Sequence, residues 1–150
     1  MEKSISDVLN ELLLKTFKQI LDVEQHEIKK GPFNNLSISE IHAIEAIGMY
    51  QQKTMSQVAA DLGITMGALT LFIKNLVRKG YVTRQRDDRD RRIVNISLTR
   101  KGKLAYRIHE QFHLDMVKHT VTDLNDQNDV LIKSLQKLTD YFNTKYSYDH

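Results

Sequence analysis

Five arginines and three aspartates fall within nine residues, 84–92, and this charged stretch is the feature that most constrains the fold. On either side of it apolar and polar residues alternate, over 81–86 and again over 92–98. Alternation with a period of two is typical of β-strands, because successive side chains point to opposite faces of a sheet. The pattern predicts a two-stranded hairpin with 87–91 at its tip. A solvated tip needs only one or two charges, so this one indicates a surface that meets a polyanion.

Two short helices precede the hairpin. Thr54 and Gln57 have the spacing of a capping box that opens the first helix, and Gly63 can end it in the left-handed conformation. Thr65 can cap the second helix, 66–79. Apolar spacing predicts that the second helix buries Leu69, Ile73, Leu76 and Val77. Two capped helices joined by a glycine turn predict a helix-turn-helix over 54–79, whose second helix enters the major groove of DNA.

Only Gly80 separates the second helix from the hairpin, and this order is that of a winged helix-turn-helix. The hairpin, about 82–98, is then a wing whose arginines reach phosphates or a narrow minor groove. The aspartates beside them are expected to brace those arginines through ion pairs; they are Asp87, Asp88 and Asp90. The charge distribution agrees, because residues 51–102 carry a net charge of +7 while the flanking thirds carry −3 and −1.

The rest of the chain reads as helix. Apolar residues at helical spacing predict helices over 4–30, 38–47, 100–120 and 126–146, with Thr99 capping the third of these. Ser37 and Glu40 form another capping box. We expect one mainly α-helical domain over 1–150, with a small β-hairpin wing. The DNA-binding lobe is expected over 37–99, and the apolar stripes on the terminal helices predict a dimerisation region over 1–34 and 103–150.

Composition narrows the function classes. No run of about 18 apolar residues and no signal-peptide pattern is present, so we expect a cytoplasmic protein without a membrane partner. The chain has no cysteine, which excludes disulfides and thiolate metal sites. No glycine-rich phosphate loop, nucleophile elbow or metal-hydrolase motif appears, so the sequence favours a binding protein over an enzyme. A winged helix that binds protein partners instead of DNA is a further alternative, which salt-dependent DNA binding would exclude.

The outward face of the helix 66–79 offers methyl and methylene groups and almost no side chain that could bond a base bidentately. Such a face should favour the thymine methyl, and wing arginines prefer the narrow minor groove of A-tracts. We therefore expect a dimer bound to an A·T-rich inverted repeat. The expected DNA-binding residues are Thr65, Met66, Gly67, Ala68, Thr70, Leu71 and Lys74 on the helix and Arg84, Arg86, Arg89, Arg91 and Arg92 in the wing.

Residues 55–103 resemble the winged helix-turn-helix core of MarR-type bacterial regulators. The shared marks are Leu62-Gly63-Ile64-Thr65, the Leu-x-x-Lys-Gly-Tyr pattern at 76–81, Asp90-Arg91-Arg92 and Leu98-Thr99-x-x-Gly102. The flanking helices match as well. This resemblance implies a transcriptional regulator that works as a homodimer, in which the first, fifth and sixth helices of both chains interlock.

Within that family, residues 37–48 and 107–117 look like the FabT-like branch, the repressors of fatty-acid synthesis genes in Gram-positive bacteria. This resemblance implies an acyl carrier protein with a long acyl chain as corepressor. The acyl chain would occupy a pocket between the helical arms and the DNA-binding lobe. The expected pocket residues are Ile38, Ile41, His42, His109, Phe112, His113 and Met116.

His109 and His113 are spaced i, i+4 and so share one helical face, a spacing that suits zinc. In the zinc-sensing branch of the same family a glutamate and three histidines bind the metal, and Glu24, His42, His109 and His113 stand at the matching positions; His26 is another candidate on the first helix. The interpretation we favour is that these side chains hydrogen-bond one another at the mouth of the pocket without a metal. A zinc-responsive repressor and a regulator of another small-molecule response remain the alternatives.

Overall fold

The computed structural model describes residues 2–121 and 127–146. Its elements are α1 (Ile5–Lys30), α2 (Ile38–Ile47), β1 (Lys53–Thr54), α3 (Met55–Leu62), α4 (Met66–Lys79), β2 (Val82–Arg86), β3 (Val94–Leu98), α5 (Arg100–Val121) and α6 (Asn128–Lys145). They confirm the mainly helical winged helix-turn-helix. Residues 1, 122–126 and 147–150 of the expected dimerisation region, including the expected start of its last helix, lie outside the described residues.

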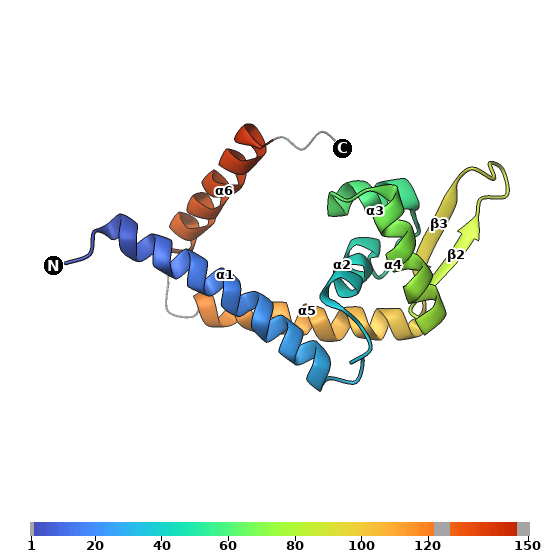
Figure 1. Ribbon diagram of the computed structural model, residues 1–150, viewed down its shortest axis with the longest axis horizontal. Coiled ribbons are helices and arrows are strands. Elements are labelled where there is room, and N and C mark those ends of the chain that lie inside the picture. The colour runs from blue at the N-terminus through green and yellow to red at the C-terminus, as the bar shows by residue number, and fades with distance from the viewer. Residues whose placement is uncertain (1, 122–126, 147–150) are drawn as a thin grey trace.

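The elements form a compact lobe and a set of extended arms (Figure 1). The lobe holds α2, α3, α4 and the sheet, while α5 runs along its base and on to the N-terminal side of the molecule, where α1 and α6 lie. The fully buried core lies in the lobe and includes Ile44, Ile47, Leu69, Ile73, Leu76, Tyr81 and Ile96. Val77 is an exception to the expected core, because 40% of its surface is exposed on the flank of α4.

Side-chain caps start each helix of the lobe, as the sequence predicts. The Ser37 hydroxyl accepts from the Glu40 amide at the start of α2, and the Thr54 hydroxyl accepts from the Gln57 amide at the start of α3. Both caps are reciprocal, since each side chain at the third helical position bonds the amide of the capping residue. Thr65 caps α4 through the Ala68 amide. Gly63 and Gly80, at φ 65° and 87°, end α3 and α4 in the left-handed conformation.

The sheet has three strands in the order β1-β3-β2, one more than the predicted hairpin. β2 and β3 pair antiparallel with Arg84 opposite Ile96. β1 pairs with the other edge of β3, where Lys53 lies opposite Ile96. We define the wing as residues 82–98. This third strand directly precedes α3, so it fixes the start of the helix-turn-helix to the base of the wing.

The wing and α5 meet at a tight junction. The Thr99 amide donates to the Tyr81 carbonyl oxygen at 3.0 Å, and the Thr99 hydroxyl donates to the Gly80 carbonyl oxygen at 2.6 Å. The same hydroxyl accepts from the Gly102 amide at 3.1 Å, which confirms Thr99 as the cap of α5. A side chain at position 102 would overlap the Tyr81 carbonyl group. This junction joins the arm helix α5 rigidly to the base of the wing.

The arms expose many large apolar side chains, among them Leu9, Leu12, Phe17, Val117, Leu135 and Phe142. Among the described residues no single helix is long and apolar enough to cross a membrane. α3 and α4 reach that length and hydropathy only together, and they are bent by 110° at the turn between them.

Candidate nucleic-acid interface and histidine cluster

The outward face of α4 carries the residues of this helix that are expected to contact DNA. Met66, Gly67, Thr70, Leu71 and Lys74 are exposed, as is the capping residue Thr65, and Ala68 is half-buried. The Thr70 hydroxyl donates to the Met66 carbonyl oxygen at 2.7 Å, so its oxygen remains free only to accept a hydrogen bond. The face therefore presents mainly apolar groups, as expected.

The wing holds its arginines on an ordered turn. Arg92 Nε lies 3.0 Å from Asp90 Oδ1. Hydrogen bonds from Arg92 lower the pKa of the Asp90 carboxyl, and the same pair raises the pKa of the Arg92 guanidinium. The Asp87 carboxylate instead accepts from the backbone amides of Arg89 and Asp90. Of the three aspartates expected to pair with arginines, only Asp90 does so among the described residues.

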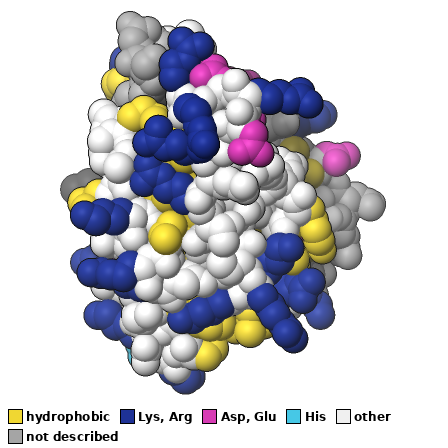
Figure 2. All heavy atoms as spheres, turned by 90° about the vertical axis from the view of Figure 1, so that its right-hand side faces the viewer, with side chains coloured by type: hydrophobic (Ala, Val, Ile, Leu, Met, Phe, Trp, Pro, Cys, Tyr) yellow, Lys and Arg dark blue, Asp and Glu magenta, His cyan; other side chains and the backbone are white. Residues whose placement is uncertain are grey.

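The other arginines of the wing remain exposed. Arg84, Arg86, Arg89 and Arg91 all lie at the surface, and Arg86 reaches only the Arg91 carbonyl oxygen, at 3.4 Å. Their guanidinium groups are therefore available to an anionic ligand. Figure 2 looks onto the end of the molecule that carries α4 and the wing, and Lys and Arg side chains outnumber acidic ones over this face.

A hollow of about 220 Å³ separates α4 from the wing. Its lining includes the expected residues Met66, Thr70, Arg84 and Arg92. It also includes Thr54 and Ser56 at the start of α3 and Ile93 and Val94 in the wing, which the sequence did not single out as DNA contacts. The capping box before α3 is the sequence signal that could have drawn attention to the first two, because helix N-termini favour phosphate.

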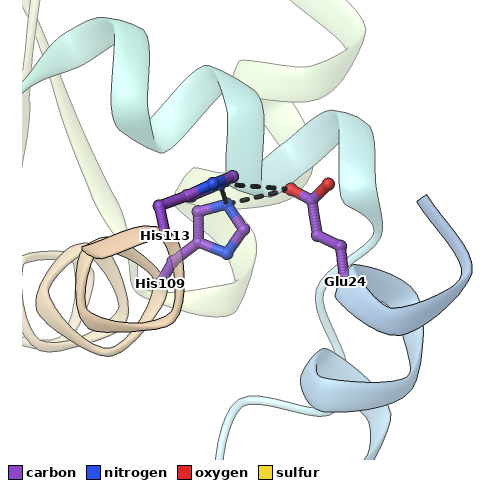
Figure 3. A group of neighbouring side chains, drawn as sticks. All are labelled: Glu24, His109 and His113. Atoms are coloured by element: carbon purple, nitrogen blue, oxygen red, sulfur yellow. Dashed lines mark hydrogen bonds and ion pairs between the residues drawn. The ribbon is translucent and has the colours of Figure 1, made fainter. Parts of the chain in front are cut away.

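The four candidate zinc ligands converge, although they come from three helices. Glu24 of α1 places Oε1 3.0 Å from His42 Nε2 on α2 and 2.9 Å from His109 Nε2 on α5. His113 Nε2 lies 2.9 Å from His109 Nε2 and 3.8 Å from the same Glu24 oxygen. Figure 3 shows Glu24, His109 and His113 pointing toward one another. Only 2% of Glu24 is exposed, so the imidazoles compensate a buried carboxylate. His26, the other candidate on α1, is exposed.

Glu45 joins this group, and the sequence reasoning missed it. Its Oε1 lies 2.8 Å from His109 Nε2 and 3.5 Å from His113 Nε2. Burial raises the pKa of Glu45, but the hydrogen bond from His109 and the charges of the three histidines outweigh it, so the pKa is lowered overall. Glu45 lies three residues after His42 on the same face of α2, and this spacing was the available signal. We call Glu24, His42, Glu45, His109 and His113 the histidine cluster.

A cavity of about 310 Å³ lies next to the histidine cluster, between the C-terminal end of α1 and α5. Ile41, His109 and Phe112, three of the expected pocket residues, line it. The remaining lining residues are Glu27, Ile28, Lys30, Gly31, Pro32, Phe33, Ala105 and Ile108. The other expected pocket residues lie elsewhere: His42 and His113 in the histidine cluster, Ile38 in a hollow beside α2, and Met116 in a groove between α1, α5 and α6.

Known proteins with similar sequences and structures agree with a winged helix-turn-helix. Residues 36–94 match the MarR family. The chain is 35% identical to Streptococcus pneumoniae FabT, solved in complex with DNA, with a TM-score of 0.87 over 93% of this chain and 98% of that one.

Two relatives known by sequence are also regulators. The transcriptional regulator AdcR of Streptococcus pneumoniae serotype 2 is 30% identical over 122 residues, which is 79% of this chain and 76% of AdcR. The HTH-type transcriptional regulator SarZ of Staphylococcus saprophyticus is 41% identical over 58 residues, 39% of this chain and 40% of SarZ.

Proposed function

This chain belongs to the MarR family of winged helix-turn-helix transcriptional regulators, and we propose that it is a cytoplasmic repressor of fatty-acid synthesis genes. In this proposal a homodimer binds an A·T-rich inverted repeat, and a long acyl chain carried by acyl carrier protein increases its affinity for the operator. Like its relatives, it is a regulator of transcription and not an enzyme.

The observation that carries the DNA-binding part is the apolar outward face of α4 beside the exposed arginines of the wing. Lys and Arg side chains gather over this end of the molecule (Figure 2). Met66 and Leu71 are 46% and 58% exposed on α4, and they suit the methyl group of thymine. Arg89 and Arg91 lie on the wing turn and suit a narrow minor groove. Both preferences favour A·T-rich DNA.

The apolar arms support the dimer. A groove between α1, α5 and α6 is lined by Ile20, Val23, Val117, Leu131, Ile132 and Leu135. Contiguous exposed apolar side chains of this kind are typical of a protein–protein contact, and a second copy related by two-fold symmetry would cover them. The same symmetry suits an inverted repeat in DNA.

The cavity beside α5 supports the acyl ligand. Its volume of about 310 Å³ lies at the lower end of the range for small-molecule sites, and Ile28, Phe33 and Ile108 give it apolar walls. Residues 37–48 and 107–117 resemble the FabT-like branch, and this resemblance supports acyl carrier protein as the partner that carries the acyl chain. A regulator of another apolar small molecule would use the same cavity.

Operator affinity measured by fluorescence anisotropy tests this proposal. Long-chain acyl carrier protein should strengthen operator binding by about 1–3 kcal/mol, and free carrier protein should have a smaller effect. Ile108→Asp places a charge in the cavity and should abolish the response. Leu104→Asp, at an exposed position of α5 outside the cavity lining, is the matched control and should retain it. Equal operator affinity with and without the acylated carrier would exclude the acyl ligand.

The histidine cluster supports a second candidate, a zinc-responsive repressor. Three imidazoles and a buried carboxylate within hydrogen-bonding distance form a donor set that zinc accepts. Glu24, His42, His109 and His113 would hold the ion, which would cross-link α1, α2 and α5. A chelator should then weaken operator binding, and His113→Ala should have the same effect. Metal-free protein that binds its operator equally well with and without added zinc would rule this candidate out.

A further inference from the structure

We propose that Glu45 is a fifth protein ligand of the cation site in the histidine cluster, so that the site holds an ion with three nitrogen and two carboxylate oxygen donors. This inference rests on the second candidate function, the binding of a metal ion by the other four residues. It adds a residue that the sequence resemblance does not include.

The contacts of His109 are the first argument. Its Nε2 has three polar neighbours at 2.8–2.9 Å: Glu45 Oε1, Glu24 Oε1 and His113 Nε2. One ring nitrogen carries either a single proton or a single lone pair, so it cannot make three good hydrogen bonds. A cation among these atoms would satisfy all of them at once. Glu45 supplies the shortest of the three contacts.

The spacing of the donor atoms is the second argument. Zinc lies about 2.0–2.2 Å from nitrogen and oxygen ligands, so two ligands at right angles are about 3 Å apart, and two at the tetrahedral angle about 3.4 Å. The separations of 2.8, 2.9 and 3.0 Å that join Glu45, His109, Glu24 and His42 match right angles, while His113 Nε2 stands at wider angles, 3.5 Å from Glu45 Oε1 and 3.8 Å from Glu24 Oε1. Right angles occur in five- and six-coordinate sites and not in tetrahedral ones, so the spacing favours a fifth donor.

Charge and position are the third argument. Two carboxylates with three neutral imidazoles carry a charge of −2, which one divalent cation balances. The side chain of Glu24 is 3% exposed and that of Glu45 is 35% exposed, so Glu24 closes the buried side of the site and Glu45 the side near solvent. Since Glu45 lies on α2, its bond to the ion would hold the DNA-binding lobe to the arm helix α5.

Cobalt(II) is the probe for the test, because its visible absorption reports coordination number and grows stronger as five-coordinate sites become four-coordinate. Metal-free full-length protein is titrated with Co²⁺, and zinc affinity is then measured by competition with a chelator. Wild type should bind one ion per chain. Glu45→Ala should weaken Co²⁺ and Zn²⁺ binding about 10–100-fold and intensify the cobalt bands. Glu110→Ala, which removes an exposed carboxylate next to His109 in the sequence, should match wild type.

Two results would overturn the inference, and they are distinguishable. Metal binding by wild type with unchanged affinity and spectrum in Glu45→Ala would leave a four-ligand site and exclude Glu45. Failure of wild type to bind either ion would exclude the metal-responsive candidate and the role of Glu45 together. Circular dichroism of the Glu45→Ala and Glu45→Gln variants checks that they fold. A folded Glu45→Gln variant should lose less affinity for Co²⁺ and Zn²⁺ than Glu45→Ala.

Discussion

Lys79 Nζ lies 2.9 Å from Glu40 Oε2, and this ion pair joins the last turn of the recognition helix α4 to the first turn of α2. The lysine also donates to the Asn35 carbonyl oxygen at 2.6 Å. The side chains are 20% and 8% exposed, so the pair is shielded from solvent. It fixes the direction of α4, the helix that we propose to enter the major groove.

Glu40→Gln removes the charge at this pair while keeping a side chain that can complete the cap at Ser37. It should lower the free energy of unfolding by about 2 kcal/mol, because Lys79 is left in a partly buried site without its counter-ion. Urea unfolding measures this. Glu11→Gln breaks the pair between Lys3 and Glu11, both 60% exposed, and should cost less than about 1 kcal/mol. Equal costs would show that the Glu40 pair has no special structural role.

Gly102→Ala tests the junction between the wing and α5. The new methyl group would overlap the Tyr81 carbonyl oxygen and crowd the Leu98 side chain, so strand or helix must shift. We expect the free energy of unfolding to fall by about 1–3 kcal/mol. Gly67→Ala is the matched control, since a methyl there has only the Thr65 hydroxyl within 4.0 Å. It should stabilise α4 by about 0.5–1 kcal/mol. A stabilising Gly102→Ala would contradict the described junction.

Arg91→Ala tests the wing. Its guanidinium lies on the exposed turn, and its loss should cost about 1–3 kcal/mol of operator binding. Arg89→Ala should behave similarly. Lys3→Ala removes a positive charge just before α1 and should leave operator binding unchanged, because the N-terminal end of α1 lies far from the wing (Figure 1). Binding of both arginine variants at wild-type affinity would exclude minor-groove contact by the wing.

Leu135→Glu tests the dimer. Leu135 is 52% exposed in the groove between α1, α5 and α6, and a carboxylate there would be desolvated by a second copy. The variant should sediment as a monomer at concentrations at which wild type is a dimer. Tyr50→Glu changes a residue that is 86% exposed in the loop after α2, outside this groove, and should remain dimeric. A dimeric Leu135→Glu would place the interface elsewhere.

The sequence predicts the elements of this fold well where local chemistry decides them. The caps at Ser37, Thr54, Thr65 and Thr99 are short-range, and each forms as expected. β1 was missed because two residues cannot show alternation, and its pairing with β3 is a long-range contact. Such pairings depend on the whole tertiary fold.

The candidate sites show the same division. Exposure of the predicted α4 and wing residues follows from helical and strand periodicity. Glu45 was missed because a single glutamate on a helix is usually a solvated surface residue, and only the packing of α2 on α5 brings it to His109. The lining of the cavity likewise depends on how α1 ends beside α5, which periodicity cannot specify.

Selection of bound sequences from a pool of random duplexes tests the central claim most directly. The account predicts an A·T-rich inverted repeat whose half-site centres are about one helical turn apart, bound by one dimer, with affinity that falls as salt rises. Recovery of a G·C-rich consensus, or of no inverted repeat at all, would contradict it.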